Sequence, residues 1–72
     1  MAEQTRLVKD FVTGTDEHAV LIKPLEGGRI EYFSEYFGDH SDNWLIRYDA
    51  NGIEHDRYNI RYVTCFEWMP IT

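Results

Sequence analysis

The segment RIEYFSEYF, residues 29–37, constrains the fold more than any other part of this sequence. Alternate residues of a strand lie on opposite faces, which here gives Ile30, Tyr32, Ser34 and Tyr36 on one face and Glu31, Phe33, Glu35 and Phe37 on the other. Both faces carry aromatic side chains, which is typical of a strongly bent strand in a small barrel. The segment therefore predicts one strand of a small, curved β-sheet.

The other segments predict one short helix and four more strands. In residues 5–13, Leu7, Val8, Phe11 and Val12 recur at helical spacing, and Gly14 follows as a stop signal, so we expect a helix there. Composition predicts further strands at about 18–25, 43–48, 53–58 and 61–69. We therefore expect a single domain over residues 1–72: a short N-terminal helix followed by a five-stranded, strongly bent antiparallel small barrel.

The size of the chain favours self-association. A domain of 72 residues buries only about 60% of its unfolded surface, and the single cysteine, Cys65, excludes a disulfide within one chain. Open strand edges must also be covered or paired, so we expect a homo-oligomer that closes as a ring. The core cannot take every aromatic residue, and we assign to an interface Tyr58, Tyr62, Phe66 and Trp68.

Charge and hydropathy limit the partners. The formal net charge is −6, and such a chain repels phosphate at long range, so a basic protein surface is the default partner. The sequence shows no apolar N-terminal run and no apolar stretch near the roughly 18 residues that span a bilayer. With only one thiol, these features predict a soluble, cytoplasmic protein without a membrane partner.

The order of elements and several spaced residues resemble the Sm-like family, which comprises the Sm, LSm and Hfq proteins. The first family motif is matched by Phe37, Asp39, Asn43, Leu45 and Ile46, with Gly38 as one extra residue. The second motif resembles RYNIRYVT, which starts at Arg57, has Tyr58 in place of the family glycine and is one residue short. The resemblance covers roughly residues 18–69.

This resemblance implies a ring of five to seven subunits that binds single-stranded RNA in its pore. Asn43 would hydrogen-bond a base edge, and Arg57 would contact base or phosphate. His40 is the nearest candidate for stacking on the base, and Asp39 completes the matched set. Asp42, next to Asn43, adds a negative charge that would face phosphate.

Simpler interpretations exist for the same residues. Asn43 is more often a turn residue, and Arg57 more often pairs with a neighbouring carboxylate such as Glu54. Asp39, His40 and Asp42 match no metal-binding motif, so we expect neither a metal nor a cofactor. Cys65 has no histidine at a readable catalytic spacing, and we expect no enzymatic activity.

Three functions follow from these features. The first is an Sm-like or Hfq-like RNA-binding oligomer, which depends on the spaced residues. The second is an acidic inhibitor or adaptor, of the type that phages encode, that docks on a basic nucleic-acid-handling protein; its contacts would be Glu31, Glu35, Glu54, Asp56 and Glu67. The third is a structural ring subunit without a ligand. Spaced residues are more specific than bulk charge, so the first is slightly favoured.

Overall fold

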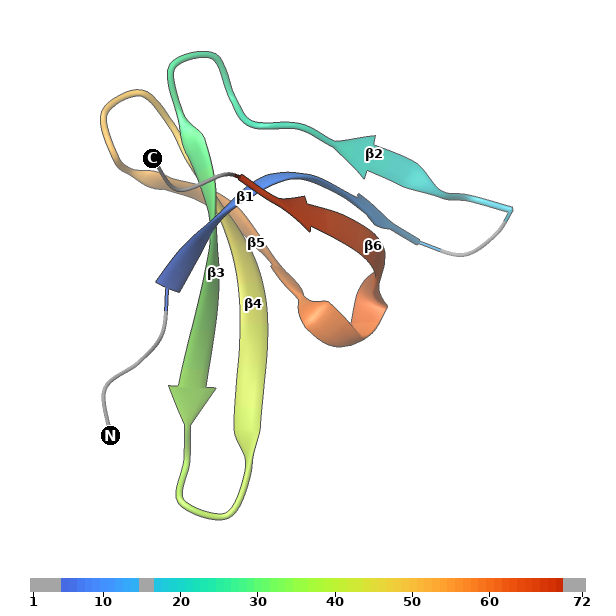
Figure 1. The fold of residues 1–72 in the computed structure, drawn as a ribbon, viewed down its shortest axis with the longest axis vertical. Helices are drawn as coiled ribbons and strands as arrows, with labels where there is room; N and C mark the ends of the chain where they lie inside the picture. The colour runs from blue at the N-terminus through green and yellow to red at the C-terminus, as the bar shows by residue number, and fades with distance from the viewer. Residues whose placement is uncertain (1–4, 15–16, 70–72) are drawn as a thin grey trace.

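The computed structural model describes residues 5–14 and 17–69, which form a strongly curled antiparallel sheet (Figure 1). The elements in chain order are β1 (Thr5–Thr13), β2 (Val20–Ile22), β3 (Arg29–Tyr36), β4 (Ser41–Tyr48), β5 (Glu54–Asn59), the 3-10 helix η1 (Ile60–Tyr62) and β6 (Val63–Trp68). The prediction of a mainly β, strongly bent antiparallel fold is confirmed. No helix of the described residues is long and apolar enough to cross a membrane.

Strand β1 is central in the sheet and pairs with β2, β3 and β6. Val8 pairs with Ile30 of β3 and also with Trp68 of β6, so β3 and β6 lie on opposite sides of β1. Phe11 likewise pairs with β2 on one side and β6 on the other. Strands β2 and β3 therefore follow one another along the same edge of β1, and β4 and β5 continue the sheet beyond β3.

Three strands of the curled sheet lie at an edge. Over residues 5–14 and 17–69, β5 pairs with β4 alone, whereas β2 and β6 each pair with β1 alone. Each of these strands thus presents one row of backbone groups without a strand partner in the same chain. The sheet bends toward a barrel, with its ends connected covalently by η1 (Figure 1).

The predicted helix at residues 5–13 is wrong, because these residues form β1. Val8 lies opposite Trp68 and Phe11 lies opposite Phe66, so three steps along β1 match two steps along β6. This β-bulge inserts one residue and reverses the alternation of faces. Both Val8 and Phe11 therefore point into the core, at a spacing that also suits one turn of a helix.

The remaining boundaries are mostly as predicted. The strands expected at 29–37, 43–48 and 53–58 are confirmed within two residues. The strand expected at 18–25 is reduced to Val20–Ile22, just before Pro24, which cannot donate to a ladder. The strand expected at 61–69 begins two residues later, because η1 occupies Ile60–Tyr62.

The core lies on the concave side of the sheet. Four apolar side chains are almost completely buried there: Val8, Phe11, Ile30 and Leu45. Partly buried neighbours pack against them: Ile22, Tyr32, Tyr58, Ile60, Val63 and Phe66. We call the face of β3, β4 and β5 that carries Ile30 and Leu45 the core face. The opposite face, which carries Ile46 at 2% exposure, is the outer face.

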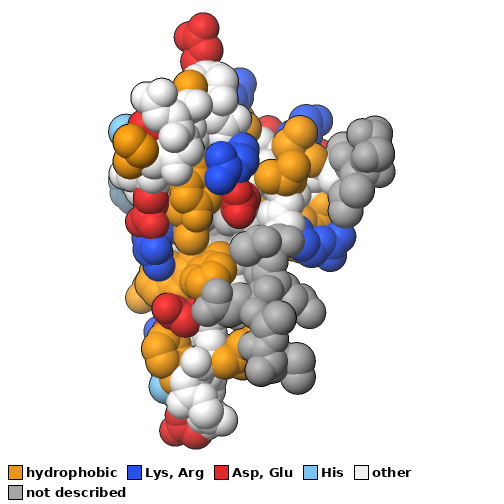
Figure 2. Space-filling model, turned by 90° about the vertical axis from the view of Figure 1, so that its left-hand side faces the viewer, with side chains coloured by type: hydrophobic (Ala, Val, Ile, Leu, Met, Phe, Trp, Pro, Cys, Tyr) orange, Lys and Arg blue, Asp and Glu red, His pale blue; other side chains and the backbone are white. Residues whose placement is uncertain are grey.

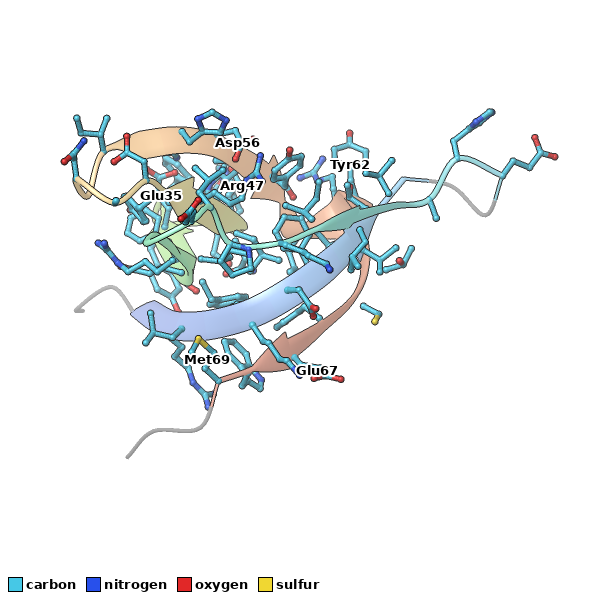
Figure 3. All side chains as sticks on the ribbon, turned by 90° about the horizontal axis from the view of Figure 1, so that it is seen from above. Glu35, Arg47, Asp56, Tyr62, Glu67 and Met69 are labelled. Carbon is cyan, nitrogen blue, oxygen red and sulfur yellow. The ribbon has the colours of Figure 1, made fainter. Side chains whose placement is uncertain are left out.

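Arg47 of β4 forms hydrogen bonds with β5 and with the segment after β2, at the edge of the core face. Its guanidinium donates to both carboxylate oxygens of Asp56 on β5, at 3.0 and 2.7 Å, and to the carbonyl of Lys23 at 3.1 Å. Figure 3 shows the Arg47 and Asp56 side chains directed toward one another. The pair fixes the β4–β5 register and attaches the segment after β2 to it.

Candidate ligand groove

A groove of about 520 Å³ lies on the outer face, where β4 and β5 meet η1. Its lining residues are Asp42, Trp44, Arg57, Tyr58, Asn59, Arg61 and Tyr62. Two of the seven basic residues of the chain thus line one groove beside Trp44 and Tyr62, and Tyr58, whose ring packs on Phe11, also contributes to the lining. Each arginine has a carboxylate partner, Glu54 for Arg57 and Asp42 for Arg61.

The β4–β5 pairing places Arg57 over Trp44. Trp44 lies opposite Asn59 on β5, and Arg57 is on the same face two residues away. The guanidinium carbon of Arg57 is 5.3 Å from the centre of the Trp44 ring, within the range of a cation–π contact. Nε1 of Trp44 is buried and has no hydrogen-bond partner among the described residues.

Glu54 holds Arg57 in this position. Arg57 donates two hydrogen bonds to the Glu54 carboxylate, from Nε at 3.0 Å and from Nη2 at 2.7 Å. These hydrogen bonds raise the pKa of Arg57 and lower the pKa of Glu54. A two-point contact of this kind restrains the orientation of the guanidinium, so Arg57 forms a fixed wall of the groove.

Arg61 is held much less firmly than Arg57. The side chain of Asn59 accepts a hydrogen bond from the Arg61 backbone N–H at 3.0 Å, which fixes the backbone of η1. Among the residues that the structure describes, however, the Arg61 guanidinium has one charged partner, Oδ1 of Asp42 at 3.6 Å, and the Arg61 side chain is 64% exposed. An exposed contact at this distance restrains a long side chain little.

The two tyrosines of the groove differ in exposure. Tyr62 is 65% exposed. Its backbone is fixed, because its carbonyl accepts a hydrogen bond from the Thr13 hydroxyl at 2.9 Å, whereas its ring remains accessible. Tyr58 packs edge-to-face on Phe11 with centroids 5.1 Å apart. Burial raises the pKa of Tyr58, whose hydroxyl also donates to Asp56 at 3.1 Å. Tyr62 is therefore the ring available to a ligand.

The residues predicted to bind RNA do not come together within one chain. Asp39 and His40 contact each other at 2.7 Å in the β3–β4 turn, at the far end of the hairpin (Figure 1). Asn43 lies on the core face, where its Oδ1 accepts a hydrogen bond from Ser34 at 2.8 Å. Arg57 lies on the outer face. Of the four predicted residues, Arg57 alone lines the groove.

The residues predicted for an interface divide into two groups. Tyr58 and Tyr62 line the groove. Phe66 and Trp68 pack with Tyr32 in a separate aromatic cluster, with centroid distances of 5.1 to 6.2 Å, and Arg6 lies 4.1 Å above the Trp68 ring. Figure 3 shows the separation, because Tyr62 lies on one side of β1 while Glu67 and Met69 of the β6 segment lie on the other.

Most of the acidic residues considered as protein contacts are already paired. The ion pairs are Glu31 with Arg29, Glu54 with Arg57, Asp56 with Arg47, and Glu67 with Lys9. On the side of the molecule in Figure 2, hydrophobic, basic and acidic side chains are interspersed, without a broad area of one charge. A basic partner that binds one of these four carboxylates would therefore have to compete with an ion pair within the chain.

Sequence reasoning missed Trp44, Asn59 and Arg61 as members of one site. A signal for two of them existed in the Asn51–Gly52 turn. A two-residue turn at Asn51–Gly52 would place Trp44 opposite Asn59, its observed partner, but the strands reach this pairing through a register shift between Arg47 and Tyr48 that the sequence pattern does not show. Arg61 could not be found in this way, because its position depends on η1, and the sequence pattern predicted a strand there.

Comparison with protein-family models, with curated proteins and with solved structures found no match. Within the described parts of the chain, no group of three or more His, Cys, Asp or Glu side chains is arranged to hold a metal ion. The function proposed for the groove therefore depends on the chemistry of the residues that line it.

Proposed function

We propose that this protein is a non-enzymatic, Sm-like or Hfq-like oligomer that binds single-stranded RNA in the groove of each chain. The observation that carries this proposal is the grouping of Trp44, Arg57, Arg61 and Tyr62 around one groove. Proteins that bind single strands combine aromatic faces, on which bases stack, with basic side chains that follow the backbone. The groove has both components on rigid elements, β4, β5 and η1.

The residues have distinct roles in this proposal. A base stacks on the exposed ring of Tyr62, and Arg61, whose side chain is 64% exposed, reaches a phosphate. Arg57 stays over Trp44 because Glu54 holds it, and it supplies positive potential rather than a mobile contact. One phosphate contact on a single strand predicts a slope of about −0.7 for log K against log salt concentration.

The open edges of β5 and β6 support the oligomer. Each strand has one side without a strand partner in the described chain, and pairing of β5 from one copy with β6 from the next would cover both. Repetition of this head-to-tail contact closes a ring. Such a ring would bring several grooves into one assembly and add their weak affinities.

Fluorescence anisotropy with labelled oligo(U) and oligo(A) at low salt tests the proposal. Arg61→Ala and Tyr62→Ala should each weaken binding about fivefold or more, since each loses a phosphate or stacking contact. Lys9→Ala removes the same charge from an exposed pair on β1, and Tyr36→Ala removes an exposed ring in the β3–β4 hairpin. Both of these control variants should bind as the unmodified protein does.

Two results would overturn the proposal. One is the absence of oligonucleotide binding by the unmodified protein at low salt. The other is an equal loss of affinity in Arg61→Ala and in Lys9→Ala, which would mean that bulk charge rather than the groove attracts the RNA.

The second candidate, an acidic adaptor that docks on a basic protein, is favoured by one observation. Both groove arginines already have a carboxylate partner, Glu54 for Arg57 and Asp42 for Arg61. The same carboxylates could receive lysine or arginine side chains of a partner. A labelled oligolysine peptide that binds where oligo(U) does not, with loss of binding in Asp42→Asn, would support this function instead.

A further inference from the structure

The two arginines of the groove have carboxylate partners of different kinds. Glu54 and Arg57 are three residues apart on the same strand and share two hydrogen bonds. Asp42 and Arg61 come from two different elements that line the groove, β4 and η1, and their charged atoms are 3.6 Å apart. The Asp42–Arg61 contact therefore joins two elements of the groove, whereas the Glu54–Arg57 contact lies within β5.

If Arg61 were absent, the Asp42 carboxylate would be in an unfavourable electrostatic position. It pairs directly opposite Glu35 in the β3–β4 ladder, on the same face of the sheet. Like charges at directly opposite positions destabilise a strand pair. Arg61 compensates this repulsion in the free protein, and the Asp42 side chain, at 26% exposure, is more restrained than that of Arg61.

We propose that Asp42 gates the groove by occupying Arg61 in the free protein, so that a ligand phosphate must displace the Asp42 carboxylate to bind. This inference rests on the proposed RNA-binding function and deepens it. A phosphate that approaches Arg61 competes with one exposed ion pair and meets the negative charges of Asp42 and Glu35. The gate thus selects against weakly bound anions and for ligands that also stack on Tyr62.

The variant Asp42→Asn tests the gate. It keeps the size of the side chain, frees Arg61 and relieves the repulsion from Glu35. We expect oligo(U) to bind about two- to fivefold more tightly than to the unmodified protein. The matched control is Asp39→Asn, which makes the same change in net charge at an exposed position in the β3–β4 turn. We expect its affinity to stay near that of the unmodified protein.

A second measurement is independent of RNA. The NMR signal of the Arg61 Nε–H should move in Asp42→Asn without any ligand, and it should not move in Asp39→Asn. This result would establish the contact even where oligo(U) does not bind, so failure of the RNA-binding proposal and failure of the gate are distinguishable.

The following results would overturn the gate. The affinity for oligo(U) is unchanged or weaker in Asp42→Asn, or it rises equally in Asp42→Asn and Asp39→Asn, which would indicate bulk charge alone. An Arg61 signal that does not respond to Asp42→Asn would also contradict it.

Discussion

Arg57 and Asn43 illustrate how one residue step decides the composition of a site. Arg57 lies opposite Ile46, three residues after Asn43 on β4, and an odd number of steps along a regular strand changes the face. The spacing that resembles the Sm-like motifs says nothing about faces, so it could suggest both residues but could not show that their side chains diverge. The role of Arg57 as a site residue stays a prediction, and its pairing with Glu54, which the sequence offered as the simpler interpretation, is observed.

Asp56 is the residue for which the structure makes the clearest prediction about pH. Hydrogen bonding by Arg47, aided by Tyr58, lowers the pKa of Asp56 despite the opposing effect of its burial. A carboxyl group whose pKa is lower in the folded state stabilises the fold fully above its unfolded pKa of about 4. That stabilisation is lost as the pH falls through the lower folded value.

Asp56→Asn should therefore destabilise the protein by about 1 to 3 kcal/mol at neutral pH and by less in acid. Urea unfolding at neutral pH and at about pH 3 measures the difference. Glu67→Gln, which breaks the exposed pair with Lys9, should change stability by less than about 0.5 kcal/mol at either pH. An equal loss in Asp56→Asn at both pH values would contradict the role assigned to its charge.

At the scale of elements, the sequence predicted the strands whose alternation is regular. β3, β4 and β5 have clear periods or a defined turn, and all three were found. β1 was assigned as a helix because a bulge, which depends on its pairing with β6, places Val8 and Phe11 on one face. η1 was missed because three residues are too few for a periodic signal. The first error comes from pairing between distant segments, which local patterns do not contain, and the second comes from the shortness of the element.

The open edges of β5 and β6 lead to a prediction about assembly. Light scattering should give a mass several times the 8.6 kDa of one chain, because edge pairing between copies covers both strands. Cys65→Lys places a charge on the exposed part of β6 and should lower this mass, since lysine on an edge opposes pairing. Ile53→Lys, in the exposed β4–β5 turn, makes the same change in charge and should not.

A monomer for the unmodified protein at every concentration tested would contradict the ring. An equal fall in mass for Cys65→Lys and Ile53→Lys would show that added charge, rather than the β6 edge, controls assembly.

At the scale of the whole molecule, the net charge and the groove favour different kinds of partner. The chain carries a net charge of −6, yet the curled sheet places two arginines, Trp44 and Tyr62 around one groove. Composition alone predicted a basic protein as the default partner. The groove arises from the meeting of β4, β5 and η1, and composition contains no information about that meeting. The position of the groove is therefore the central claim for function.

NMR mapping of oligo(U) binding tests this claim most directly. During titration of ¹⁵N-labelled protein at low salt, the account predicts that the backbone signals of residues 42–44 and 57–62 change most, while those of the β3–β4 turn at 38–40 stay unchanged. Changes concentrated in the β3–β4 turn, or none in either region, would contradict it.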